Sequence, residues 1–312
     1  MKDFHYYLCR QLKGGGMEIF MNIPAIPISG TTKLTALLGS PVSHSISPLM
    51  HNRAFQYLGL DYAYLCFDVT EKTLPEAVEG LKAVGIRGFN LTMPNKNKIM
   101  ELVDHISPVS QICKSINTVV NDNGVLTGTS TDGIGYMEAV RDAGYDVAGQ
   151  EITMMGGGGA STAICAQAAL DGIRHIHIFV RPSSRFYRRT LELADTINRT
   201  TSCRATVYDH DDKTALRQAL SRSRLLINGT PVGMAPDAEH SIIEDTSLFH
   251  EDLIVSDLIY NPRKTRLMQL AESVGCKTFN GMYMLLYQGA ESFRIWTGQD
   301  MPVELIKQEY FS

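Results

Sequence analysis

Short apolar runs alternate with helical patterns along most of this chain, and one run leads directly into four consecutive glycines. Residues 151–155 are typical of a buried strand, residues 156–159 are the glycines, and residues 160–170 are typical of a small-residue helix. A strand, a glycine turn and a helix in that order let the backbone approach a bound phosphate closely. Because strands that alternate with helices form mostly parallel sheets, the pattern predicts an α/β fold.

The same periodicities predict the other elements and divide them into two series. The second series begins near Glu151, which favours two domains. Strands are predicted at residues 34–39, 63–68, 88–91, 116–121, 125–129, 175–180, 205–208, 225–228 and 254–258. Helices are predicted at residues 47–58, 74–83 and 98–103, with two more that start near Asp212 and Lys264.

Composition excludes several classes of protein. The 312 residues include 29 basic and 33 acidic side chains, for a net charge of −4, so nucleic acid and anionic membranes are not expected partners. No apolar stretch approaches the roughly 18 residues of a membrane helix. The six cysteines are scattered without a CxxC pair, which favours reduced thiols in a cytoplasmic protein. Residues 1–30 are predicted to be a disordered extension or the product of an overlong start, with translation beginning at Met17 or Met21.

The glycine run predicts a dinucleotide site at Gly156, Gly158, Gly159 and Ala160, although a ligand-free turn would have the same pattern. The residue after the next strand distinguishes the cofactors. An acidic residue there suits the ribose of NAD, whereas an arginine suits the 2′-phosphate of NADP. Arg181 follows that strand, with Arg185 nearby and no acidic residue between them, so we predict NADP and keep NAD as an alternative.

Two polar clusters are candidates for substrate binding and catalysis. Ser45 and Ser47 enter a predicted helix N-terminus and offer two hydroxyls to a carboxylate, and Ser47 is also expected to cap that helix. Asn90, Thr92 and Lys96 follow a predicted strand. A lysine and an aspartate beside a substrate hydroxyl can exchange its proton while hydride leaves the adjacent carbon, and Asp132 is the candidate partner of Lys96.

A histidine pair is the remaining candidate for metal binding. His175 and His177 lie two residues apart on a predicted strand and so share a face. With no third ligand nearby in the sequence, we predict an exposed strand face and no metal site.

Nine segments together resemble the shikimate dehydrogenase family, including its quinate/shikimate branch. Their order along the chain is the order in that family, and they extend from residue 39 almost to the C-terminus. They are GSPVSHSISPLMHN at 39–52, NLTMPNK at 90–96, INTV at 116–119, TDG at 131–133, GGGGA at 156–160, NGTPVGM at 228–234, DLIYNP at 257–262, NGMYMLLYQG at 280–289 and FRIWTG at 293–298.

The resemblance implies a substrate domain at residues 31–132 and 276–312 and a Rossmann-type dinucleotide-binding domain at 133–275, with the active site in the cleft between them. It implies reversible reduction of 3-dehydroshikimate to shikimate with NADPH, in chorismate and aromatic amino acid biosynthesis. Lys96 and Asp132 correspond to the catalytic pair, Ser45 and Ser47 to the carboxylate binders. The other implied site residues are Thr92, Asn117, Tyr260 and Gln288 for substrate, and Gly156, Gly158, Gly159, Ala160, Arg181, Thr230, Met234 and Gly281 for cofactor.

The chain departs from the family pattern at Ser130, Val180, Tyr283 and Lys114-Ser115. These departures leave three alternatives open: a quinate/shikimate dehydrogenase that uses NAD, an enzyme for another ring acid, and a non-catalytic ligand-binding protein on the same fold. Whether the chain forms a homodimer also stays open.

Overall fold

The computed structural model describes residues 28–311, and the first of the two sheets in this range is mixed. Its strand order is β2-β1-β3-β5-β6-β4. Because β5 runs antiparallel to both β3 and β6, those two strands point the same way and end at the same edge. The strands are β1 (Lys33–Gly39), β2 (Tyr62–Asp68), β3 (Gly88–Leu91), β4 (His105–Ile106), β5 (Thr118–Asp122) and β6 (Val125–Thr129).

The second sheet is parallel throughout, with the order β12-β11-β10-β7-β8-β9. This is the Rossmann order, in which the strand order reverses between β7 and β10 and leaves a crevice for a ligand. The strands are β7 (Glu151–Met155), β8 (His175–Val180), β9 (Arg204–Asp209), β10 (Ser223–Asn228), β11 (Ile254–Asp257) and β12 (Lys277–Asn280). The predicted α/β class, with a Rossmann-type second half, is therefore confirmed.

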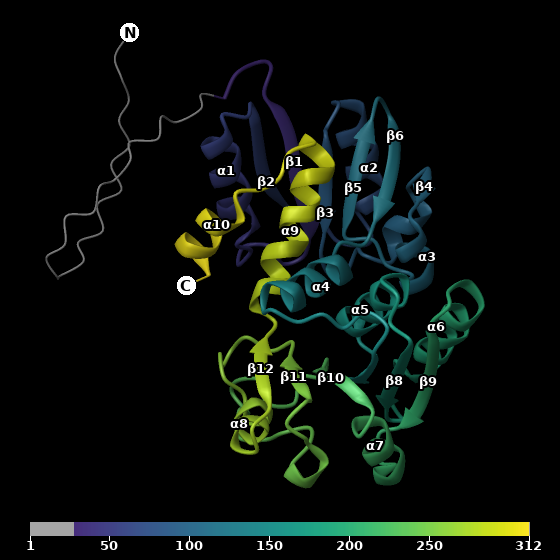
Figure 1. Ribbon diagram of the computed structural model, residues 1–312. Coiled ribbons are helices and arrows are strands. Elements are labelled where there is room, and N and C mark those ends of the chain that lie inside the picture. The colour runs from purple at the N-terminus through teal and green to yellow at the C-terminus, as the bar shows by residue number, and fades with distance from the viewer. Residues whose placement is uncertain (1–27, 312) are drawn as a thin grey trace, which may run out of the picture.

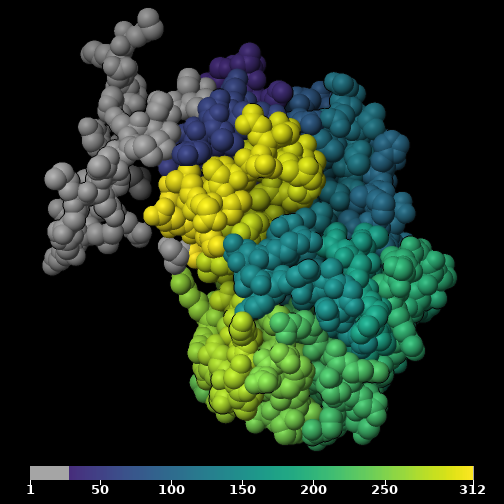
Figure 2. All heavy atoms as spheres, viewed as in Figure 1, coloured from purple at the N-terminus to yellow at the C-terminus, as the bar shows by residue number. Residues whose placement is uncertain are grey.

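Helices cover both sheets, and the last two return to the first sheet (Figure 1). Figure 2 shows the C-terminal residues in yellow lying on the blue N-terminal half, above the green residues of the second sheet. The helices are α1 (Ser47–Leu58), α2 (Leu74–Ala83), α3 (Pro108–Cys113), α4 (Asp132–Asp142), α5 (Gly159–Leu170), α6 (Tyr187–Thr200), α7 (Lys213–Leu220), α8 (Arg266–Ser273), α9 (Met282–Thr297) and α10 (Val303–Tyr310), with 3₁₀ turns at Lys98–Glu101 and Thr246–Leu248.

One predicted domain boundary is wrong. The predicted division assigns residues 276–280 to the first domain, but β12 pairs in parallel with β11 in the second sheet. The chain therefore returns to the first sheet only with α9, and the rest of the predicted division stays a prediction. The predicted N-terminal extension lies almost wholly outside the described residues. Among residues 28–311, no helix is both long and apolar enough to span a membrane.

Alternation along β1 shows how the first sheet is packed on both faces. Ala36 and Leu38 join the cluster that α2 covers, whereas Leu37 joins the cluster that α1 and α9 cover. A period of two along a strand places successive side chains on opposite faces, so a continuous apolar run produces a sheet buried on both sides. The central strands of the first sheet are therefore buried on both faces, which favours a ligand site at a strand end.

A buried histidine makes the core under α9 sensitive to acid. The His51 ring stacks on Tyr64 with centroids 4.5 Å apart, and neither ring nitrogen has a hydrogen-bond partner among residues 28–311. Burial lowers the pKa of His51 from 6.5 to about 3, so the folded ring is neutral. Below pH 6.5, His51 is protonated in the unfolded chain but stays neutral in the folded chain. The free energy of unfolding therefore falls as the pH falls toward 3.

Replacing His51 with phenylalanine is expected to remove this acid sensitivity while keeping the ring. Between pH 4.5 and 6, the free energy of unfolding should fall less steeply with decreasing pH in His51→Phe than in the unaltered protein. The two slopes should differ by about 1.4 kcal/mol per pH unit. Urea unfolding of both proteins across that range measures the two slopes. Equal slopes would mean that His51 does not titrate differently in the folded and unfolded chains.

Candidate active site

The cavity at the carboxyl edge of the first sheet has a volume of about 540 Å³ and opens between the two halves of the molecule. Its wall combines loops that follow β1 and β3, the N-terminal residues of α4 and α5, and the start of α9. The predicted site residues that line it are Ser45, Ser47, Thr92, Lys96, Asn117, Asp132, Ala160, Tyr260, Gly281 and Gln288.

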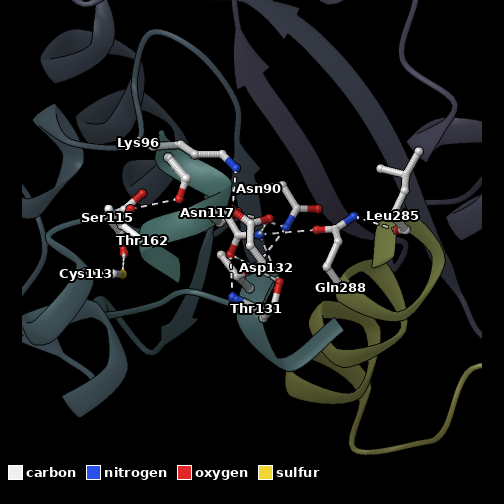
Figure 3. Close-up of polar contacts among 12 residues, drawn as sticks. Asn90, Lys96, Cys113, Ser115, Asn117, Thr131, Asp132, Thr162, Leu285 and Gln288 are labelled. Atoms are coloured by element: carbon white, nitrogen blue, oxygen red, sulfur yellow. Dashed lines mark hydrogen bonds and ion pairs between the residues drawn. The ribbon is translucent and has the colours of Figure 1, made fainter. Parts of the chain in front are cut away.

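Lys96 and Asp132 form an ion pair inside this cavity, with Nζ and Oδ2 separated by 2.6 Å (Figure 3). Lys96 lies in the turn after β3, and Asp132 begins α4 just after β6. The two strands end at the same edge, which brings together two residues 36 positions apart. The side chains are 27% and 13% exposed, so the pair is accessible to a ligand while solvent screens it only in part.

Asn117 holds the aspartate from the other side. Its Nδ2 donates to Asp132 Oδ1 at 2.8 Å and to Gln288 Oε1 at 3.2 Å, and its Oδ1 accepts from the Thr131 N–H at 2.7 Å. Each carboxylate oxygen of Asp132 therefore has its own donor. This arrangement fixes the carboxylate plane and keeps Oδ2 directed at Lys96.

Asn90, which the sequence placed in the same candidate cluster as Thr92 and Lys96, is a buried residue that organises the site. The Asn90 carbonyl oxygen accepts from the Tyr64 hydroxyl at 2.9 Å. Its Nδ2, which has two N–H donors, lies 3.0 Å from each of three acceptors, the Asn117 main-chain carbonyl and the Thr118 and Ser292 hydroxyls. Asn90 lies among the polar residues that follow a predicted strand, but its link to Ser292 on α9 joins segments that no local pattern connects. The cavity also meets His44, Tyr310 and Phe311, which sequence reasoning missed.

Ser47 does not have its predicted capping role at the start of α1. Ser47 was expected to cap the helix, but no side chain caps α1, and the Ser47 N–H instead donates to the Ser45 Oγ at 3.2 Å. The side chain that accepts a backbone N–H at this helix start is therefore that of Ser45 and not that of Ser47. Both residues line the cavity, and the first turn of α1 contains no acidic residue, so its N–H groups favour an anion there.

The glycine turn lies at the reversal point of the second sheet. Gly156 has a φ of +100°, and a Cβ there would lie 2.9 Å from the Thr230 Cγ2 atom. A Cβ on Gly158 or Gly159 would meet nothing within 4 Å, so the space before α5 is open. Such a cradle before a helix N-terminus without acidic residues fits a pyrophosphate. Of the predicted turn residues, Ala160 also lines the substrate cavity.

Other predicted cofactor residues lie around this crevice. Thr230 follows β10, and its hydroxyl and N–H both bond to the Asn228 Oδ1, at 2.7 and 3.0 Å. Arg181 follows β8, and its side chain is exposed. The pKa of His210 is lowered by the partial burial of that histidine and by the nearby charge of Arg181. Met234 is 47% exposed and does not line the cavity, whereas Gly281 does.

A parallel sheet with a glycine turn at its reversal point, facing a cavity with a lysine–aspartate pair, defines a dinucleotide-dependent oxidoreductase. The NADP(+)-type shikimate dehydrogenase of Listeria innocua is 46% identical over 284 residues, covering 91% of this chain and 97% of that protein. The chain belongs to the shikimate dehydrogenase family, which confirms the resemblance and the enzyme class.

Further comparisons agree with this membership. The shikimate dehydrogenase substrate binding domain matches residues 37–119, and the shikimate 5'-dehydrogenase C-terminal domain matches residues 281–309. A quinate/shikimate dehydrogenase of Escherichia coli is 43% identical, covering 90% of this chain and 97% of that protein. The crystal structure of shikimate 5-dehydrogenase from Listeria monocytogenes, in complex with shikimate and NAD, has a TM-score of 0.89 and 46% identity, covering 92% of this chain and 99% of that chain.

Proposed function

We propose that this enzyme reversibly reduces 3-dehydroshikimate to shikimate with NADP(H). The observation that carries the proposal is the Lys96–Asp132 pair, held by Asn117 in a cavity that also meets the first turn of α5. The names of relatives that cover nine-tenths of the chain, NADP(+)-type shikimate dehydrogenases, support the same substrate and cofactor. In this proposal the first sheet and α9 bind the substrate, and the second sheet binds the dinucleotide.

The polar residues of the cavity would orient the substrate by its distinct groups. Ser45 and Ser47, at the helix N-terminus, would bind the carboxylate. Thr92, Asn117 and Gln288 would bind ring hydroxyls, with Tyr260 on the carboxylate side. Since Asn117 contacts both Asp132 and Gln288, a hydroxyl bound there would lie beside the lysine–aspartate pair.

The cofactor would lie across the reversal point of the second sheet. Its pyrophosphate would meet the N–H groups of Gly156, Gly158, Gly159 and Ala160, and Arg181 would meet the 2′-phosphate. Thr230, Met234 and Gly281 would line the nicotinamide side. When bound, the nicotinamide supplies or accepts the hydride at its C4 atom.

Lys96 and Asp132 would handle the proton of the same reaction. In the oxidation direction the substrate O–H breaks, its proton passes to this pair, and the C=O double bond forms as the adjacent C–H electron pair leaves as hydride. In the reduction direction Lys96 returns the proton to the oxygen. Asp132 would keep the Lys96 amine in place and balance its charge.

Steady-state assays with four substrate pairs test the proposal. The values of kcat/KM for shikimate and for quinate, each with NADP and with NAD, give substrate and cofactor preference together. We expect the largest value for shikimate with NADP. A larger value for quinate with NAD would support the quinate/shikimate alternative, and binding of shikimate without turnover would support a non-catalytic protein.

Replacing Arg181 with alanine is expected to weaken NADP specifically. Losing a charged contact to the 2′-phosphate should raise the KM for NADP by about 10- to 100-fold, or about 1.5–3 kcal/mol, and leave the KM for NAD nearly unchanged. Arg188→Ala is the matched control, because that arginine is 93% exposed and pairs only with Glu192 among the described residues. Equal losses for both cofactors would contradict a 2′-phosphate role for Arg181.

A cytoplasmic location and a homodimeric assembly stay parts of the proposal. The described cysteines are all free, which fits a reducing compartment. Light scattering on the purified full chain measures the assembly state directly.

A further inference from the structure

The amino edge of the second sheet gathers two histidines and a glutamate, away from the active site. Glu151 begins β7 and pairs in register with His175 at the start of β8, and His177 follows on the same face. Gly156 lies just past the opposite end of β7, so the cluster and the dinucleotide crevice lie at opposite edges. The predicted exposed strand face is wrong, because the His177 side chain is 0% exposed.

The three ligand atoms lie at distances that suit one metal ion. His177 Nε2 lies 3.0 Å from Glu151 Oε2, and His175 Nδ1 lies 4.0 Å from the same oxygen. All three atoms lie within 4.8 Å of one another. Two ligands with bonds of about 2.0–2.1 Å to a tetrahedral zinc lie about 3.3 Å apart, so the observed distances bracket the value required.

The far nitrogen of each ring is already oriented by a hydroxyl on β9. His175 Nε2 lies 2.9 Å from Thr206 Oγ1, and His177 Nδ1 lies 3.4 Å from the Tyr208 hydroxyl. These contacts leave Nδ1 of His175 and Nε2 of His177 directed at the glutamate. Histidines that bind metals characteristically use the second nitrogen in this way, which fixes the ring and its tautomer.

Three arginines oppose a cation here: Arg174, Arg222 and Arg204, the last of which lies beside His175 in the register of β8 and β9. Arg174 contacts the other glutamate oxygen, Oε1, at 3.1 Å and does not block Oε2. Arg222 Nε lies 3.6 Å from Oε2 itself, and its side chain is 56% exposed. A metal on Oε2 would displace Arg222, whose charge lowers the affinity of the site.

We propose that Glu151, His175 and His177 bind one Zn²⁺ ion, which ties β7 to β8 at the amino edge of the second sheet. A water molecule completes the four ligands. The site lies at the edge opposite the active site, and it does not depend on the proposed function.

Zinc titration of the tag-free full chain, after chelation and dialysis, tests the site by calorimetry and by the Tm. We expect one Zn²⁺ per chain with a higher Tm. Glu151→Gln and His175→Ala should each weaken binding at least about tenfold. His240→Ala is the control and should change nothing, because His240 is an exposed histidine that contacts only Asp237 among the described residues.

Arg222→Gln keeps the test informative if a ligand variant folds poorly. Removing the Arg222 charge should increase the affinity for zinc several-fold. A loss of structure would not increase this affinity, so the two effects can be distinguished. Zinc binding that is unchanged in Glu151→Gln and His175→Ala would mean binding at other groups, such as the thiols. That result, or no binding at millimolar zinc, would overturn the proposal.

Discussion

Replacing Lys96 with alanine is expected to lower kcat for shikimate oxidation by about 10²–10⁴-fold, the usual contribution of a positioned acid–base group. The Lys96 amine lies 2.6 Å from the Asp132 carboxylate within the cavity, and in our proposal this pair receives the substrate proton. The KM for shikimate should change far less, because the carboxylate site is formed by other residues. Steady-state kinetics with saturating NADP separate the two constants.

Two further variants show whether Lys96 acts together with Asp132. Lys98→Ala is the matched control, since Lys98 is 38% exposed and pairs with Glu101, and it should keep kcat. Asp132→Asn should lose nearly as much activity as Lys96→Ala, and the double variant should lose little more than either, because residues that act as a unit are not additive. An unchanged kcat in Lys96→Ala, or losses that multiply, would contradict the assignment.

The catalytic pair was accessible to sequence reasoning because it lies at strand ends. Apolar runs correctly indicated β3 and β6, and polar side chains directly after a buried strand are where α/β proteins place ligands. The sequence pattern does not show in which direction each strand runs within the sheet. The pair meets only because β5 reverses the chain between the two strands, and a sheet that was parallel throughout would have needed different connections.

Contacts between distant segments account for most of what sequence reasoning missed. Asn90 is held by Ser292, 202 residues later, and the third candidate metal ligand, Glu151, precedes the histidines by one whole crossover. The wrong prediction of a helix cap at Ser47 has a different cause. Ser45 and Ser47 both fit a helix start, and the positions differ by less than the uncertainty of helix ends read from sequence.

Helix α4 was also missed, and its glycines explain why. Gly133 and Gly135 lie in its first turns, where glycine disfavours a helix. Both are needed for packing, because α4 lies between α5 and α9. A Cβ on Gly133 would lie 2.3 Å from the Ala163 carbonyl oxygen, and one on Gly135 would lie 2.4 Å from the Gln288 nitrogen. Close packing at this point therefore overrides local helix propensity.

Replacing Gly135 with alanine is accordingly expected to lower both stability and activity. The added methyl would meet the backbone of α9 at Gln288 and Met284, and α4 cannot move away without pressing Gly133 into α5. We expect a loss of about 2–3 kcal/mol in the free energy of unfolding, the upper part of the range for overpacking. Because Asp132 begins α4 and Gln288 lies on α9, kcat should also fall at least about tenfold, as expected for a misplaced catalytic group.

Gly80→Ala separates packing from helix propensity in this test. Gly80 lies on the exposed face of α2, where a Cβ would meet nothing within 4 Å, so alanine there should stabilise the protein by about 0.5–1 kcal/mol. Urea unfolding and steady-state kinetics of both variants give the comparison. If Gly135→Ala matched Gly80→Ala in stability and kept kcat, the α4–α9 contact would not hold Asp132 in place. A stable but slow Gly135→Ala enzyme would instead show that this contact serves the geometry of the site more than the fold.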